Sequence, residues 1–271
     1  STGNVLVQTG SSSSSTSGSV SIATGDSSDR AGSINIAGGL SNGEAADVNL
    51  KGGDNSAKSS NSVGGSVLFE GGVGSIGGSV DITSGEGIHG DGGAINVVAG
   101  AGASLANGGS VLIAGGASTS TPSEHGGSVS VVGGDASAGN ARGGDVLVSG
   151  GAASSQAGGA LRLSGGESLS GPSGEVIIST PTPAASADQV SSSGSIALAT
   201  GSVASGTTGD VRISTGSVAN SGDAGSIAIV SGSGSTGGSV SIQSGVSGEN
   251  AHVSVSGSNG VSLSSEVGTI D

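Results

Sequence analysis

The hydrophobic residues of this chain recur in pairs that are separated by one residue and enclosed by glycines. The segment GGSVDITSG at residues 77–85 is one example, and GSVSIATG, GSINIAGG and GSVLIAGG are close relatives of it elsewhere in the chain. Alternation of β-branched residues with a period of two, bounded by glycine, predicts a short β-strand with one buried face. In residues 77–85 this register places Val80 and Ile82 on the buried face and Asp81 on the outward face.

The pairs repeat along the whole chain, so they indicate a building unit rather than a single site. Their mean spacing is about 15.5 residues, and a period of this size is typical of a solenoid or an array. With a shorter last unit at Val261, the chain contains about 18 units. The first residues of the other pairs are Val5, Val20, Ile34, Val48, Val67, Val80, Ile95, Val111, Val129, Val146, Leu161, Val176, Ile196, Val211, Ile227, Val240 and Val253.

The inward-facing residues of these units are the predicted structural core. We expect that core to contain Val5, Val20, Ile22, Ile34, Ile36, Val67, Phe69, Val80, Ile82, Ile95, Val97, Val111, Ile113, Val129, Val131, Val146, Val148, Leu161, Leu163, Val176, Ile178, Ile196, Leu198, Val211, Ile213, Ile227, Ile229, Val240 and Ile242.

The predicted fold is all-β, an elongated parallel β-solenoid with two units per coil and two facing sheets. Each unit offers one convincing strand, and a lone strand needs a second face to bury against. A narrower solenoid with one unit per coil also fits the period. An antiparallel meander is the third alternative, although connections of about eight residues are long for hairpins.

The connections between the predicted strands are rich in Gly, Ser, Ala and Asn and vary in length, as exposed loops do. The two longest interruptions, residues 51–64 and 180–195, are expected to be irregular loops within a single repeat domain of residues 1–271. Asn259-Gly260 predicts a closing hairpin or a change of register. Single apolar residues in the connections are expected to anchor them against the core: Leu40, Ile88, Leu105, Leu169, Val203 and Val218.

Composition narrows the function. The 271 residues include 59 glycines, one Phe and no Cys, Met, Trp or Tyr, so any core is thin and disulfides are excluded. The net charge of −14 argues against nucleic-acid binding, which needs a positive surface. No apolar run is long enough to span a membrane. The chain starts without Met inside a repeat, which predicts a processed product or a fragment.

No group of residues in the sequence predicts catalysis, so we expect no enzyme. His89, His125 and His252 are not spaced as metal ligands, and the large apolar side chains that line substrate pockets are lacking. No phosphate-binding motif occurs, and no cofactor is expected.

Two binding hypotheses, for calcium and for ice, and one modification, O-glycosylation, stay open on the same scaffold. Calcium suits the loop carboxylates, of which GGD at 52–54, 133–135 and 143–145 are examples, although the repeat lacks the nonapeptide of calcium-binding β-rolls. Ice binding needs a regular row of Thr, whereas the outward positions are mixed. The Ser/Thr clusters at 11–17 and 117–123 could accept O-linked sugars on a secreted protein.

The units resemble the Gly/Ser/Val-rich repeats of secreted surface proteins of microalgae such as diatoms, and more loosely the solenoid stems of bacterial filamentous adhesins. This resemblance implies an extracellular, cell-surface or fibrous role, with other surface proteins or glycans as further partners. Because the first unit has no cap, we predict a filament of copies stacked head to tail. The alternatives are a stretch of a longer chain and a binding module for calcium, ice or glycan.

Overall fold

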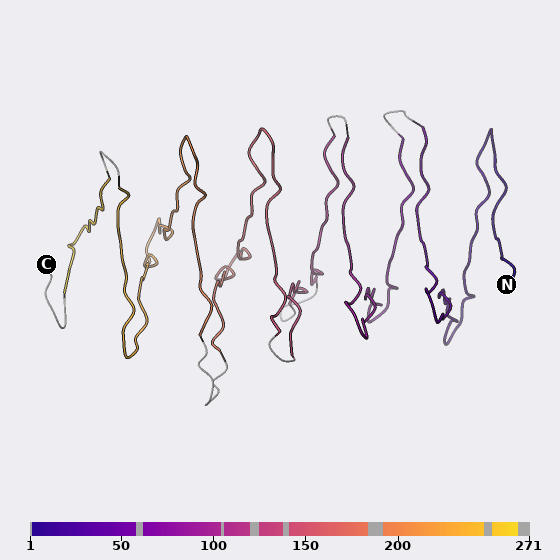
Figure 1. The fold of residues 1–271 in the computed structure, drawn as a ribbon, viewed down its shortest axis with the longest axis horizontal. Helices are drawn as coiled ribbons and strands as arrows, with labels where there is room; N and C mark the ends of the chain where they lie inside the picture. The colour runs from indigo at the N-terminus through magenta and orange to yellow at the C-terminus, as the bar shows by residue number, and fades with distance from the viewer. Residues whose placement is uncertain are drawn as a thin grey trace. The chain divides into compact units, whose positions relative to one another are not determined.

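The structure is a computed structural model that describes residues 2–57, 62–103, 106–119, 125–137, 141–183, 192–246 and 251–264. No residue in these ranges belongs to a helix or a strand, and the trace runs in extended segments joined by bends (Figure 1). The predicted all-β parallel solenoid is therefore wrong. The period-two pattern defines an apolar face, but it does not supply the neighbouring segment that a ladder of hydrogen bonds requires.

Backbone hydrogen bonding supports this correction. The described residues make 11 backbone–backbone hydrogen bonds, all between residues at most 12 apart in the chain. A folded globular chain has roughly one hydrogen bond per residue, most of them between backbone groups. The extended segments thus leave most of their N–H and C=O groups facing solvent.

The chain divides into two compact units, Ser1–Val132 and Gly133–Asp271, each of which contains many of the sequence repeats. Both units are built from the same eight-residue segment, which we call an arm. Gly78–Gly85 is an example: it starts at a returning glycine (Gly78), carries the apolar pair at its third and fifth positions, and ends at an accepting glycine (Gly85). The residue just before the accepting glycine, Ser84 in this arm, is called the preceding residue. The segment between two arms is a connection.

The apolar pairs of the arms have nearly the same environment from one repeat to the next. Apart from Val5, which is 93% exposed, the first residues are 49–61% exposed and the second residues 62–75% exposed. The repeat that the sequence predicts is therefore a repeat of local structure. Its apolar residues, however, are not buried, so the predicted core from Val5 to Ile242 is not formed within the described structure.

Among the residues that the structure describes, nine connections are closed at their base by one backbone hydrogen bond, which we call a clamp. In each clamp the N–H of a returning glycine donates to the C=O of the accepting glycine before it, with N···O distances of 2.8–2.9 Å. The clamps join Gly53 and Gly65, Gly72 and Gly78, Gly85 and Gly93, Gly100 and Gly109, Gly116 and Gly127, Gly134 and Gly144, Gly151 and Gly159, Gly166 and Gly174, and Gly232 and Gly238.

In the six clamps whose preceding residue is glycine, the two backbones approach so closely that a Cβ at that position would overlap a carbonyl oxygen. A Cβ atom built on Gly71, which precedes the accepting glycine of one clamp, would overlap the carbonyl oxygen of Gly78. Gly72 itself faces open space. The two glycines of such a pair therefore have different surroundings, and only the first of them lies at the close approach.

Two connections of the second unit have another form. Both start with the sequence TGSVA, at residues 200–204 and 215–219, and both contain a glycine with positive φ, Gly206 at 108° and Gly222 at 149°. Their valines are among the least exposed large apolar residues of the chain, with Val203 at 51% and Val218 at 46%. Of the predicted anchors, these two are partly covered.

The other predicted anchors are not covered. Leu40, Ile88 and Leu169 are 83% exposed or more, because their connections have no core beneath them, and Leu105 lies outside the described residues. At the predicted closing hairpin, a tight turn at Ser258 and Asn259 is closed by the N–H of Gly260 donating to the C=O of Gly257 at 3.3 Å. The turn is formed, but the flanking residues are not strands.

Candidate functional site

The connection between the accepting glycine Gly53 and the returning glycine Gly65 carries the richest set of polar contacts in the described chain. Just before it, the Lys51 Nζ lies 2.6 Å from the Asp54 Oδ2, so this ion pair spans the glycine pair of the clamp. Inside it, the Asn55 side chain accepts a hydrogen bond from the Ala57 N–H at 2.9 Å and donates one to the Val63 C=O at 3.2 Å. The amide of Asn55 thus ties both sides of the connection together.

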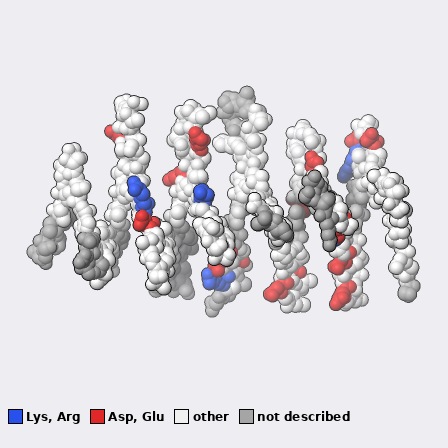
Figure 2. All heavy atoms as spheres, turned by 90° about the horizontal axis from the view of Figure 1, so that it is seen from above, with Lys and Arg blue, Asp and Glu red and all other residues white. Residues whose placement is uncertain are grey.

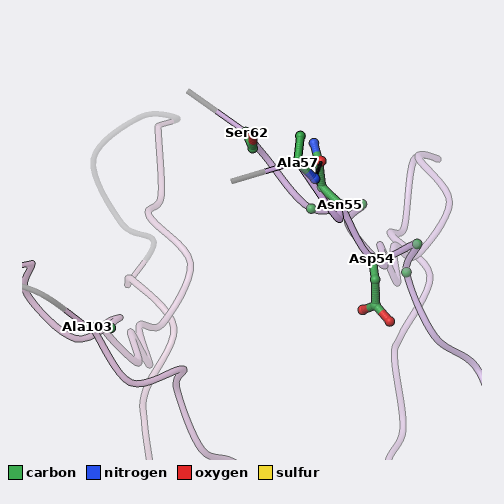
Figure 3. A pocket seen from close by; sticks show the side chains of 9 residues that line it. Asp54, Asn55, Ala57, Ser62 and Ala103 are labelled. Carbon is green, nitrogen blue, oxygen red and sulfur yellow. Dashed lines mark hydrogen bonds between the residues drawn. The ribbon is translucent and has the colours of Figure 1, made fainter. Parts of the chain in front are cut away.

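An open concavity of about 1010 Å³ lies beside this connection. Its lining consists of Gly52, Gly53, Asp54, Asn55, Ala57, Ser62, Gly64, Gly65 and Ala103. Figure 3 shows Asp54 pointing away from Asn55 and Ala57, with Ala103 on a separate segment across the opening. One carboxylate, one amide and small side chains can hydrogen-bond a polar group, but they do not form a nucleophile–base pair.

A second ion pair repeats this arrangement in the other unit. Arg142 Nη2 lies 2.7 Å from Asp145 Oδ1, again across a glycine pair, and the sequences are KGGD at 51–54 and RGGD at 142–145. All four side chains are at least 73% exposed, so each pair contributes only about 0.2–1 kcal/mol. Their contribution to stability is therefore small and confined to the four residues that each pair spans.

These ion pairs change how the predicted calcium ligands are interpreted. Two of the three GGD carboxylates, Asp54 and Asp145, already neutralise a basic side chain. Within the described ranges, no three His, Asp or Glu residues come together in a group that could hold a metal ion. Figure 2 shows the acidic side chains spread over many places on the visible face, some of them directly beside basic side chains. Calcium binding stays a hypothesis without a preassembled ligand set in this part of the chain.

The structure does not bring the predicted chemical residues together. His89, His125 and His252 are each exposed and belong to different repeats. In the serine cluster at 11–17, the Ser12 Oγ accepts a hydrogen bond from the Ser15 N–H at 3.1 Å, which makes a local turn. The cluster at 117–123 lies partly outside the described residues.

The ion pairs and the clamps are the features that the sequence interpretation missed. The GGD triplets were recognised as acidic, but the signal for pairing is the basic residue directly before the glycine pair, Lys51 or Arg142. The signal for a clamp is a small residue before the accepting glycine together with a glycine two residues before the next apolar pair.

The comparisons with known proteins give no relative for this arrangement: no family model, no curated protein and no solved structure matches the chain. In the part of the chain that the structure describes, no helix has the length and apolar character to cross a membrane.

Proposed function

We propose that this protein is a structural, extracellular component of a filament or cell surface, without catalytic activity, whose copies associate with one another through the apolar pairs of their arms. The observation that carries this proposal is the uniform exposure of those pairs. The exposure is 49–61% at every first position after Val5, so the same apolar feature is presented in each repeat.

The amount of exposed surface supports association. The accessible surface of the chain is 26356 Å² for a mass of 24.4 kDa. A folded monomer of this mass exposes about 10,000 Å² and a fully unfolded chain about 35,000 Å². A specific interface buries roughly 1,600 Å², so the available surface exceeds the requirement of a stable contact severalfold.

A second copy of the chain is the partner that matches this surface. The apolar pairs are nearly equivalent, so a segment that packs on one arm of a neighbour fits the other arms as well. Contacts of this type do not close on themselves, and they build extended assemblies. The free N–H and C=O groups of the arms add a second attraction, because extended segments pair through their backbones. The head-to-tail stacking of solenoid ends is not part of this proposal.

Sedimentation velocity and electron microscopy over a range of concentrations test the proposal. A variant with Val80→Ser, Val111→Ser, Val129→Ser and Val146→Ser removes four first positions. It is expected to raise the concentration needed for association roughly 200-fold, at about 0.8 kcal/mol for each half-exposed valine.

The matched control replaces four apolar residues of the connections, Val73→Ser, Ile76→Ser, Ile88→Ser and Leu169→Ser. These residues are at least as exposed as the valines of the arms, so association should persist. Monodisperse single chains at all concentrations would refute the proposed function, and equal loss in both variants would refute the role of the arms. Labelling of intact source cells with an antibody against the chain tests the extracellular location.

A further inference from the structure

Clamped and open connections differ in the preceding residue. In all nine clamps the preceding residue is small: Gly52, Gly71, Ser84, Ala99, Gly115, Gly133, Gly150, Gly165 and Ser231. In five other connections it is threonine: Thr9, Thr24, Thr200 and Thr215 precede a glycine, and Thr180 precedes Pro181 in place of the accepting glycine. Within the described residues, none of these five threonine connections is closed by a clamp.

We infer that the preceding residue is a conformational switch of the repeat: Gly, Ala or Ser permits the clamp, and the additional methyl group of Thr prevents it. This device goes beyond the proposed assembly and does not depend on it, because the clamp forms between neighbouring arms of one chain.

The geometry at the returning glycine gives the physical reason. When the preceding residue is Ser231 or Ala99, its Cβ would lie 3.2 or 3.4 Å from a Cβ built on the returning glycine, which is already tight. When it is threonine, the nearest atom is the Cγ2 methyl, at 3.3–3.8 Å in all five connections. In these five connections no backbone atom of a described residue lies within 4 Å of that Cβ, whereas in the nine clamps the N or O of the accepting glycine lies within 3.5 Å of it, so the methyl stands where the accepting backbone would approach. A β-branched residue is also stiff at χ1, so the methyl cannot easily turn away.

The size of the residue at the returning position also restricts clamp formation. The connection after Gly39 has a small preceding residue, Gly38, but its returning residue is Ala46 instead of glycine. Within the described residues this connection also lacks a clamp. A clamp therefore requires glycine at the returning position and a residue no larger than serine at the preceding position.

Single methyl groups test this inference. Ser231→Thr adds one methyl to a clamped connection and Thr215→Ser removes one from an open connection. The readout is residue-resolved amide hydrogen exchange of the full-length chain, at a concentration where sedimentation shows single chains. Ser231→Thr should accelerate exchange of the Gly238 amide roughly 2- to 12-fold, which corresponds to a net hydrogen bond of about 0.5–1.5 kcal/mol. Thr215→Ser should slow exchange at Gly225 by a similar factor.

Matched controls make the same chemical changes inside arms. Ser241→Thr and Thr83→Ser alter outward positions that do not adjoin a clamp, and the amides of Gly238 and Gly93 should be unaffected by them. Unchanged exchange at Gly238 in Ser231→Thr, or at Gly225 in Thr215→Ser, would overturn the inference. Equal effects of the controls would also overturn it, because they would make the methyl effect independent of position.

Discussion

Two regions of the second unit, residues 133–175 and residues 176–231, each contain three connections. The regions differ in the interactions that order these connections. In the first region, clamps at Gly134, Gly151 and Gly166 hold the bases of the connections. In the second region the preceding residues are Thr180, Thr200 and Thr215, and two of the connections instead cover a valine and turn through a glycine with positive φ.

The comparison shows that a repeat with constant arms can carry two kinds of local order. The clamped connections depend on a backbone hydrogen bond and on a preceding residue no larger than serine. The TGSVA connections depend on a side chain, because Val218 is 46% exposed whereas Leu169 in a clamped connection is 100% exposed. Four substitutions separate these two sources of order.

The largest effect is expected from Gly150→Val in the clamped region. A Cβ at this position would overlap the carbonyl oxygen of Gly159, and the two γ-methyl groups of valine add more bulk than the Ser or Ala that other clamps accept, so the clamp should open; overpacking of this kind costs about 1–3 kcal/mol. Amide exchange at Gly159 should reach the rate of an unbonded glycine. The control is the neighbouring Gly151→Ala, where a Cβ faces open space. Fast exchange of the Gly159 amide in that variant would show that any side chain disturbs the connection.

In the TGSVA region, Gly222→Ala forces a side chain onto a residue with φ of 149°. Strain of this kind costs about 1–3 kcal/mol, so the turn should open and the amides of residues 219–224 should exchange faster. Gly216→Ala is the control, since that glycine has no positive φ and its Cβ would face open space. Unchanged amide exchange of residues 219–224 in Gly222→Ala would mean that the turn at Gly222 does not stabilise this connection.

A smaller effect is expected from Val218→Ala, because about half of the side chain is already in solvent. The loss of the covered methyl groups should cost about 0.5–1 kcal/mol of local stability. Leu169→Ala in the clamped region should leave exchange at Gly174 unchanged. Proton exchange across both connections measures the difference, and equal responses would contradict a side-chain basis for the TGSVA order.

The smallest effect is expected from Arg142→Gln, which removes the ion pair with Asp145. Since the pair is worth at most about 1 kcal/mol, exchange at Gly144 should change by less than about fivefold. The change should vanish in 1 M salt, where exposed charges are screened. Arg162→Gln, in the arm Gly159–Gly166, is the matched control, and a salt-independent effect at Arg142 would mean that its packing matters more than its charge.

The sequence allows the repeat unit to be predicted but not the partner of each arm. The spacing of Val80 and Ile82 between glycines identifies a segment of constant length, and the structure repeats its environment from one unit to the next. The sheet was wrongly predicted because alternation shows only which residues share a face, whereas a ladder needs a second segment in register. Nothing in a single unit specifies that segment.

The candidate site was predicted in part. Acidic residues beside the glycine pairs were recognised, whereas their ion pairs with Lys51 and Arg142 depend on how the backbone turns across the two glycines. The anchors show the same limit. Val218 and Leu169 are each the single large apolar residue of a Gly- and Ser-containing connection, and only the form of the connection distinguishes the covered side chain from the exposed one.

The short reach of the clamps has a kinetic consequence. Each joins residues no more than 12 apart, and contact between the ends of a ten-residue loop forms in about 10–100 ns. A clamp can therefore close as soon as its own returning glycine has been synthesised, without waiting for any later part of the chain. Order in this protein would then be acquired one connection at a time, at a speed that does not depend on how many repeats the chain contains.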